Sequence, residues 1–442
     1  MIFLLFGSFI ILVYAQFPED VLQSMEHSQW ILSDSHKQSP CVAIDAHVRF
    51  RSGKLVVNVA GICSNMQTNT TVCEFRDSEN GYVVRTNSTV IRAPSSETRG
   101  GQISRLLLSQ SKYNNILMWH ALTVNCGIAP INEGTITIVY GDSQIKKIGF
   151  KTPLLDQTMS DIAVCTRLYD IRVWRPWHTA KFIEWLNWNF ALGVSCVHLY
   201  VHSLYSPEMW NVIQHYQRQY KIVLHNWSEK SSHESVANGW EFLQVSHISD
   251  CMLRLEGKFR YIGAYDHDEF INLKTIHNVA KSLITFLDDL YLENRDISNV
   301  IAFDPYIVYS KPCGEPDETL KVAEFCHACD TSFGSWTKYF VRFDDAYPLE
   351  MLPYIHDATD GRKKLTIDKS MAWIMHVNRD ESQQLHCPEP ISVEWNAAIS
   401  RFAWRLTLGE DTVKILYLNN LNSKHTPSRI QNLRRAKKIE IK

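Results

Sequence analysis

The stretch that decides the fold is RYIGAYDHDEFIN, residues 260–272. Its mostly apolar part, residues 261–265, predicts a strand that is buried on both faces and ends abruptly in charge. The acids Asp266 and Asp268 would then lie at the carboxyl end of that strand, where open α/β sheets bind their ligands. Because side chains alternate along a strand, both carboxylates are expected to face one way and His267 the other.

Two carboxylates that face one way suit a hard divalent cation. Mg²⁺ and Mn²⁺ prefer oxygen ligands, and an ion held by one or two carboxylates keeps positions open for phosphate oxygens. An Asp-x-Asp motif also occurs on ordinary solvated strand ends, since Asp is mostly exposed. The buried strand before the motif and the apolar Phe270 and Ile271 after it favour the metal site. The motif therefore predicts a cation that carries a diphosphate.

The composition describes a globular chain without the charge pattern of a nucleic-acid-binding protein. Its 442 residues suffice for roughly two or three domains, and 45% of them are hydrophobic, enough for sizeable cores. The formal net charge is −2, whereas nucleic-acid-binding domains usually carry a basic face. The basic run at residues 434–438 lies in the expected C-terminal tail, residues 411–442, and should be solvated. We expect no nucleic-acid partner.

The N-terminus predicts entry into the secretory pathway. Residues 1–15 carry no charge and are nearly all apolar, with Val13 and Ala15 placed as small residues before a cleavage point. The run lacks a positive flank and is shorter than the ~20 residues that cross a bilayer. It is interpreted as a signal peptide, after whose cleavage the chain is secreted, or as a short signal-anchor that leaves a membrane anchor at the N-terminus.

Two further features fit a secretory protein. N-glycosylation sequons occur at Asn69, Asn87 and Asn226. Eleven cysteines should mostly form disulfide bonds in an oxidising lumen, with one left over. Cys326 and Cys329 form a Cys-x-x-Cys motif that could bind zinc, but no second Cys or His pair follows at finger spacing, so disulfide bonds are favoured.

Residues 30–152 are predicted to form a β-sandwich-like domain. Short segments of alternating or β-branched residues are separated by turn residues, and no long helical repeat intervenes. The expected strands are residues 43–50, 54–60, 82–86, 116–125 and 135–140. Cys41, Cys63, Cys73 and Cys126 are the expected disulfide cysteines.

Residues 160–410 show the alternation of strands and helices that is typical of a layered α/β domain. Before the acids we predict strands at 162–166, 195–201 and 220–225 and helices at 177–192, 207–219 and 234–255. After them we predict helices at 279–292 and 394–408, a strand at 299–309, a loop-rich region at 313–330, and short elements at 336–343, 349–356 and 370–377. On the last helix, Arg401 and Arg405 are expected to face solvent.

Several pieces of sequence, in their order along the chain, resemble one known family. They are VCTR at residues 164–167, EWL at 184–186 with Gly193, LYVHS at 199–203, Gln244 with Asp250 and Cys251, DHDEF at 266–270, and residues 338–342 and 372–376. Over residues 162–405 the set resembles glycosyltransferase family 92, formerly the domain of unknown function 23.

The resemblance implies a GT-A-like fold, in which helices flank a Rossmann-like sheet, preceded here by the small antiparallel β domain. It implies a hexosyltransferase that uses a nucleotide sugar and a divalent metal, usually Mn²⁺ (or Mg²⁺). Characterised relatives are inverting galactosyltransferases that transfer galactose from UDP-galactose to glycans, and related sequences are commonly Golgi type II membrane proteins. This chain has His267 where the family commonly has Ile, Val or Leu, which should matter little if that side chain faces away from the metal.

The resemblance also suggests roles for single residues. Asp268, with Asp266 directly or through water, would hold the metal and so the two phosphates. His376 would complete the metal shell from the far side of the site. An equal alternative for His376 is a hydrogen-bonded histidine among its apolar neighbours, residues 373–375.

The donor and the acceptor need further groups. Arg167 and Lys338 could bind phosphate, although an exposed salt bridge is the default role for each. Asp250 could reach ribose or sugar hydroxyls, or equally cap or pair within the protein. An inverting transfer needs one base near the acceptor hydroxyl, and spacing cannot choose among the acids of the loop-rich region. These acids are Glu315, Asp317, Glu324 and Asp330.

Two other function classes are compatible with parts of the pattern. Some aspartyl-phosphate enzymes also place an Asp-x-Asp at the end of a buried strand, which would make the chain a metal-dependent phosphohydrolase. Those enzymes usually continue with Gly-Thr near the start of the domain, whereas here Glu269 and Phe270 follow late in the chain. The other class is a secreted, non-catalytic carbohydrate-binding protein, and the intact acids argue against it.

Overall fold

The structure is a computed structural model. It describes residues 41–51, 54–64, 71–92, 119–128, 130, 133–140, 143–151, 159–168, 176–201, 207–226, 240–274, 282–294, 300–312, 325–329, 337–342, 364–377, 390–392, 396–409, 413–414 and 417–418. The N-terminal segment 1–15 and the predicted element at 349–356 therefore lie outside the described residues. Among the helices that are described, none combines the length and the apolar character needed to span a bilayer.

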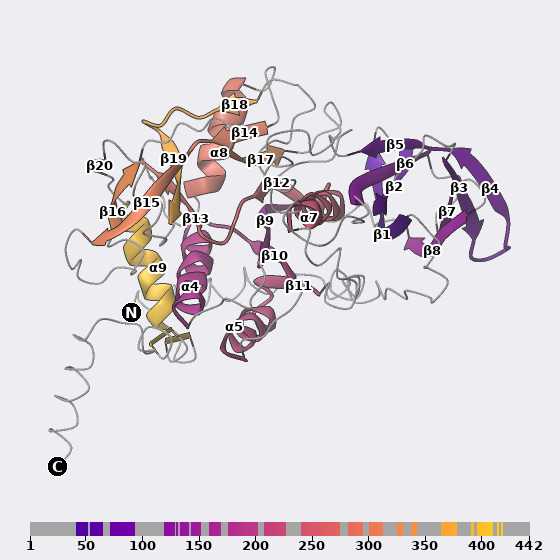
Figure 1. Ribbon diagram of the computed structural model, residues 1–442. Helices are drawn as coiled ribbons and strands as arrows, with labels where there is room; N and C mark the ends of the chain where they lie inside the picture. The colour runs from indigo at the N-terminus through magenta and orange to yellow at the C-terminus, as the bar shows by residue number, and fades with distance from the viewer. Residues whose placement is uncertain are drawn as a thin grey trace, which may run out of the picture. The chain divides into compact units, whose positions relative to one another are not determined.

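Residues 41–151 form two four-stranded antiparallel sheets (Figure 1). The first has the order β1(Cys41–Arg51), β2(Lys54–Ser64), β6(Trp119–Ile128), β5(Thr89–Arg92). The second has the order β4(Val83–Asn87), β3(Thr71–Asp77), β7(Glu133–Tyr140), β8(Ser143–Lys151). All five predicted strands overlap an observed one, whereas β3, β5 and β8 were not predicted. That these strands form a separate domain over residues 30–152 stays a prediction.

One disulfide bond joins the two antiparallel sheets. It links Cys73 of β3 to Cys126 of β6, and both cysteines are buried. The backbone register places Cys41 opposite Cys63, but the side chains of these two residues lie outside the described part. Of the sequons, Asn87 is exposed at the end of β4, whereas Asn69 and the side chain of Asn226 are not described.

A seven-stranded mixed sheet begins with four parallel strands (Figure 1). Its order is β11(Ile222–Asn226), β10(Cys196–Val201), β9(Ser160–Leu168), β12(Phe259–Ala264), β17(Lys338–Arg342), β14(Val300–Phe303), β18(Leu365–Thr366). The sheet grows from β9 through β10 to β11, and then β12 adds on the other side of β9. This reversal is a topological switch point, and in such sheets the ligand site lies outside the carboxyl ends of the two strands that flank it.

The helices connect these strands much as predicted. They are α4(Pro176–Ala191), α5(Pro207–Arg218), α7(Trp240–Leu255), α8(Ser282–Asn294) and α9(Ala397–Gly409). Pro207 occupies the first position of α5, where its missing N–H costs no hydrogen bond. On α9, Arg401 and Arg405 are exposed as predicted. The chain is thus a mixed α/β protein with a large mixed sheet and flanking helices.

A second, five-stranded sheet corrects two predictions: the single strand at 299–309, and the loop-rich region at 313–330, which contains the strand Phe325–Cys329. Its order is β13(Glu269–Leu273), β19(Ala372–Val377), β15(Pro305–Pro312), β16(Phe325–Cys329), β20(Pro390–Ser392). The single strand predicted at 299–309 is two strands, because the chain leaves the larger sheet at Asp304 and continues as β15 in the smaller one. The Asp-rich stretch crosses between the sheets in the same way, from β12 to β13.

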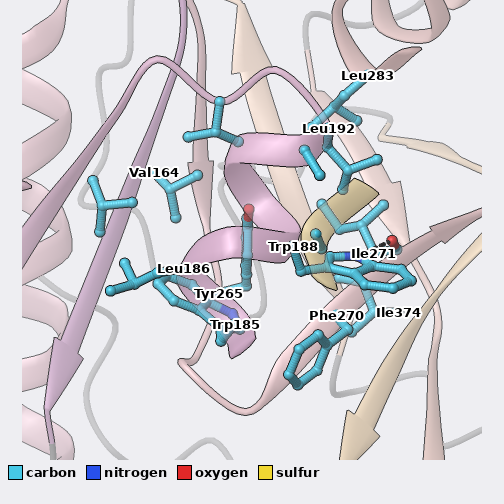
Figure 2. Close-up of a cluster of buried hydrophobic side chains, with 14 of the residues drawn as sticks. Val164, Trp185, Leu186, Trp188, Leu192, Tyr265, Phe270, Ile271, Leu283 and Ile374 are labelled. Carbon is cyan, nitrogen blue, oxygen red and sulfur yellow. Dashed lines mark hydrogen bonds between the residues drawn. The ribbon is translucent and has the colours of Figure 1, made fainter. Parts of the chain in front are cut away.

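Helix α4 lies at the centre of the hydrophobic core and is buried all round. Every residue from 179 to 189 is buried, and its indole rings pack among Tyr265, Phe270 and Ile271 (Figure 2). The helix also carries polar side chains, which a buried position tolerates only with partners. Glu184 accepts a hydrogen bond from Tyr417, Asn187 bonds Thr407 and Tyr216, and Asn189 bonds Tyr265.

Candidate functional site

Two of the three predicted metal ligands, Asp266 and Asp268, lie in a tight turn, residues 266–269, which we call the acidic turn. The Glu269 N–H donates to the carbonyl of Asp266 (3.1 Å), and the Asp266 N–H donates to Oε2 of Glu269 (2.8 Å). The expected strand alternation therefore does not apply to these residues. The turn closes on itself because the chain changes sheets here, and it follows the carboxyl end of β12 at the switch point.

The smaller sheet and α4 hold the acidic turn in place. Indole N–H groups of Trp185 and Trp188 donate to the carbonyls of Glu269 and Ile271, both at 2.8 Å, along the edge of β13 (Figure 2). From β19, the Val377 N–H donates to the carbonyl of Asp268 (2.9 Å). The backbone of the turn is therefore fixed from two sides, which is the rigidity that a preorganised site requires.

Two of the three carboxylates in the turn share one buried lysine. Nζ of Lys338 lies 2.7 Å from Oδ2 of Asp266 and 3.2 Å from Oε1 of Glu269. The side chains of Lys338 and Glu269 are each 2% exposed and that of Asp266 is 11% exposed. Lys338 therefore forms buried ion pairs, not the exposed salt bridge expected by default.

The third carboxylate, Asp268, is more open and more loosely held. Its Oδ2 lies 3.4 Å from Nε2 of His376 and 3.6 Å from Nζ of Lys181, and its side chain is 25% exposed. Lys181, on α4, also donates to the carbonyl of Val377. His376 reaches the turn because β19 pairs with β13 in a register that places it opposite Glu269.

The charges in the turn shift the pKa values of its members. Burial alone would raise the pKa of Asp268, but the charges of Lys181 and His376 outweigh it and lower that pKa well below its usual value. Burial and the nearby Asp266 raise the pKa of Glu269 to about 7, against the opposing charge of Lys338. Burial would lower the pKa of His376, but Asp268 and Glu269 raise it. Of Asp268 and Glu269, Asp268 is thus the one that is held in its ionised form.

His267, inside the turn, contacts the end of β9 and helix α4. Its Nδ1 lies 3.2 Å from the carbonyl of Arg167, and its ring packs edge-on against Phe182. Arg167 lies one residue before the end of β9 and is 5% exposed. Its neighbour Thr166 is 6% exposed, and within the described chain the Thr166 hydroxyl has no hydrogen-bond partner. The ends of β9 and β12 thus meet at the switch point.

Asp250 lies in a separate buried group, which we call the Asp250 cluster: Asp250 and Arg254 of α7, Tyr200 and His198 of β10, and His225 of β11. The Tyr200 hydroxyl donates to Oδ2 of Asp250 (2.5 Å), and Nη2 of Arg254 lies 3.2 Å from both carboxylate oxygens. Asp250 itself is 1% exposed. The structure therefore places Asp250 in a pair within the protein, and the predicted contact with the donor stays a prediction.

Oδ2 of Asp268 and Nε2 of His376 are spaced to fit one divalent cation. Two neighbouring ligands of an octahedral ion, each about 2.1 Å from it, lie about 3 Å apart, close to the 3.4 Å between Oδ2 of Asp268 and Nε2 of His376. Asp266 instead faces the Lys338 ammonium. Among the described residues no group of three or more His, Cys, Asp or Glu side chains is arranged to hold a metal. A cation here would take two protein ligands and leave its other positions to a substrate.

The sequence was compared with known families and proteins. The sequence model of glycosyltransferase family 92 matches residues 174–407, which is more than half of the chain. The chain belongs to glycosyltransferase family 92. No curated protein matches it.

Solved structures resemble the family 92 chain only weakly. A purple acid phosphatase from yellow lupin (Lupinus luteus) seeds has 8% identity and a TM-score of 0.21, over 43% of this chain and 36% of that one. A β-glucuronidase from Ruminococcus gnavus, in complex with a C6-substituted uronic isofagomine, has 10% identity and a TM-score of 0.17, over 57% and 41%. The chain thus spans less than half the length of either, and scores this low carry no argument.

The family 92 segment contains most of the predicted site. It begins two residues before α4 and ends within α9, so it includes the acidic turn, Lys338 and His376. Arg167 precedes it. A disulfide bond between Cys165 of β9 and Cys251 of α7 connects the preceding strand to the segment. The four candidate bases, residues 315, 317, 324 and 330, lie outside the described residues.

Two residues of the candidate site and one disulfide bond beside it were not predicted from the sequence. Lys181 was not singled out, although a lysine among the aromatic residues of a helix as apolar as α4 must find a charged partner when buried. Glu269 was noted only as part of the motif, yet its side chain closes the turn. The Cys165–Cys251 bond had no signal beyond the presence of both cysteines, because spacing does not determine pairing.

Proposed function

We propose that this family 92 member is a metal-dependent, inverting hexosyltransferase that transfers galactose from UDP-galactose to a glycan acceptor. The observation that carries the proposal is the pairing of Asp268 with His376 at a partly exposed turn, inside the segment that matches the family. The parallel order of β11, β10, β9 and β12 supports a GT-A-like arrangement, with the donor at the switch point.

In the proposed reaction, Asp268 and His376 hold Mn²⁺ or Mg²⁺, and Asp266 either joins them through water or remains with Lys338. The bound ion would stabilise the negative charge that develops on the departing diphosphate. Arg167, at the end of β9, lies where the donor's nucleotide or phosphates would reach the sheet edge. The acidic turn would also orient the metal and the diphosphate, because its backbone is fixed by α4 and β19 before any ligand binds.

The proposal includes the compartment. We place the chain in the lumen of the secretory pathway, as a Golgi protein that residues 1–15 anchor or release. The uncharged N-terminal run, the exposed sequon at Asn87 and two buried disulfide bonds support this, since disulfides persist in oxidising compartments. Expression in cultured cells, with and without residues 1–15, would show whether the chain is retained in the Golgi or secreted.

A donor screen tests the function. Full-length protein is incubated with Mn²⁺, a panel of UDP-sugars and a mixture of glycans, and release of UDP is measured. We expect release from UDP-galactose that requires both an acceptor and Mn²⁺ and stops when a chelator is added. Phosphomonoesters are tested in parallel. Turnover of phosphomonoesters without turnover of any UDP-sugar would contradict the proposal and favour a phosphohydrolase.

A further inference from the structure

Two buried lysines, Lys181 of α4 and Lys338 of β17, contact the acidic turn in different ways. Lys338 lies within 3.2 Å of two carboxylates, in Asp266 and Glu269, whose side chains are 11% and 2% exposed. Lys181 lies 3.6 Å from Asp268, which is beyond ordinary hydrogen-bond distance, and donates instead to the carbonyl of Val377. Asp268 is also the most exposed of the three carboxylates, at 25%. Of the two lysines, Lys181 is therefore the one that lies beside the more exposed carboxylate of the turn.

A divalent cation on Asp268 would compete with Lys181 for the same carboxylate. The ammonium and the ion carry charge of the same sign, and at a separation of a few ångströms in a mostly buried site their repulsion weakens metal binding. A diphosphate that arrives with the ion reverses this effect, because phosphate oxygens attract the ammonium in charge-assisted hydrogen bonds. The flexible four-carbon stem of lysine permits such a change of partner.

We propose that Lys181 couples the binding of the divalent cation to the binding of the diphosphate. It opposes the cation alone and favours the cation together with a diphosphate, so that the metal enters as a complex with the nucleotide. This inference rests on the proposed function, and it assigns the phosphate contact to Lys181 in place of Lys338.

Lys338 is less suited to that task. Its ammonium neutralises Asp266 and Glu269, and moving it to a phosphate would leave two buried carboxylates without their counter-ion, which is strongly unfavourable. No described ion pair joins Lys181 to Asp266 or Glu269. If Lys181 moved to a phosphate, Asp268 would have the metal as its new partner. The two lysines thus have different roles. Lys338 neutralises the buried carboxylates of the turn, and Lys181 changes its partner when the metal and the diphosphate bind.

Titration calorimetry on the full-length chain tests the proposal with Mn²⁺ and UDP as probes. Mn²⁺ is titrated alone, and UDP is titrated at saturating Mn²⁺, into wild type and Lys181→Met. We expect the variant to bind Mn²⁺ alone about fivefold more tightly, because a repelling charge is gone. We expect it to bind UDP with Mn²⁺ about tenfold or more weakly, because a charged hydrogen bond to phosphate is lost. The two affinities should therefore move in opposite directions.

Two further variants control the test. Lys221→Met removes the lysine that lies over the ring of Phe190, in the last turn of α4, and should change neither affinity. Lys181→Gln keeps a donor for the carbonyl of Val377 without the charge, so it tests the same coupling if Lys181→Met folds poorly. Thermal unfolding of each variant shows which of them is folded.

Each other outcome has a definite meaning. Weaker binding of Mn²⁺ alone by both Lys181 variants would show that Lys181 merely supports the turn, and it would overturn the coupling. Unchanged UDP affinity would overturn it as well. If the wild type binds no UDP at any Mn²⁺ concentration, the proposed function fails, whereas equal binding by wild type and variants refutes the inference alone.

Discussion

The acidic turn and the Asp250 cluster each pair a carboxylate with a cation, but the two carboxylates differ in exposure and in the distance to their partners. Asp250 is 1% exposed and has contacts of 2.5 Å to Tyr200 and 3.2 Å to Arg254. Asp268 is 25% exposed, and its nearest charged neighbours lie 3.4 and 3.6 Å away. A carboxylate with short contacts on both oxygens serves the fold, whereas an open and loosely paired one can exchange its partners for a ligand. Position near the sheet edge does not separate the two; contact distance and exposure do.

The largest expected effect is on activity when Asp268 is removed. Asp268→Ala should lower metal-dependent transfer by about a thousandfold or more, because the ion loses its carboxylate ligand. It should lower the free energy of unfolding by about 1–2 kcal/mol, less than Asp250→Ala does, since the contacts it loses are long and partly solvated. Asp161→Ala is the matched control: it removes a carboxylate 3.4 Å from Arg260 and should leave transfer unchanged. Normal transfer by Asp268→Ala would refute the site.

The next largest effect is on stability when Asp250 is removed. Asp250→Ala should lower the free energy of unfolding by about 3 kcal/mol or more, because it leaves Arg254 buried without its partner. Chemical denaturation measures this loss. The KM for the donor, measured well below the melting temperature, tests the sequence prediction that Asp250 contacts ribose or sugar. A tenfold higher KM with unchanged stability would move Asp250 into the donor site and remove the contrast.

The two regions should respond to pH in opposite directions. Burial, helped by the charges of Arg254 and Lys258, lowers the pKa of His198 to about 3 from 6.5, so the unfolded chain binds protons that the folded chain does not. His198 makes its full contribution to the free energy of unfolding well above pH 6.5, where it is neutral in both states. This contribution is lost as pH falls, by about 2 kcal/mol between pH 7 and pH 5. Glu269 has a pKa raised from 4.5 to about 7, so between these values it binds a proton more readily in the folded than in the unfolded chain, and its contribution to stability is lost as pH rises through that range.

Unfolding measurements at several pH values, with a chelator present, check these signs. His198→Gln should lose less stability than wild type on acidification from pH 7 to pH 5. Glu269→Gln should gain stability relative to wild type as pH rises over the same interval. If the stability of both variants, relative to wild type, changes in the same direction as pH rises, the pKa shifts described for the two regions are wrong.

The smallest expected effect compares two tryptophans of α4. Trp185→Phe and Trp188→Phe each remove one hydrogen bond to a β13 carbonyl and shrink a fully buried ring, and each should cost about 2 kcal/mol of stability. Trp185 bonds Glu269, inside the acidic turn, whereas Trp188 bonds Ile271, two residues beyond it. Only Trp185→Phe should therefore weaken the binding of Mn²⁺ together with UDP. Equal weakening by both variants would show that α4 supports the sheet and not the turn.

The sequence predicted the parallel strands and their helices well, since each carries a strong local pattern. Residues 207–219, for example, begin with a capping serine and a proline, and α5 occupies Pro207–Arg218. The family was also predicted, and the match over residues 174–407 confirms it. The carboxyl-edge location of the acids followed from the buried strand that precedes them.

What the sequence could not predict depends on contacts between distant segments. A change of sheet at Asp304 or within the acidic turn leaves no local signal, because apolar residues lie on both sides of each change. The partners of Asp250 and Lys338 come from other elements, so their roles as buried pairs were open beforehand. His376 was placed near Asp268 by resemblance, and the structure brings the two together through the register of β13 and β19.

The central claim is that Asp268 and His376 together bind a divalent cation that carries a nucleotide diphosphate. The most direct test is to titrate Mn²⁺ into the full-length chain in the presence of UDP and to follow the free ion by electron paramagnetic resonance. We expect one bound Mn²⁺ per wild-type chain, and at least about tenfold weaker binding in both Asp268→Asn and His376→Gln. Wild-type affinity in both variants would contradict the central claim.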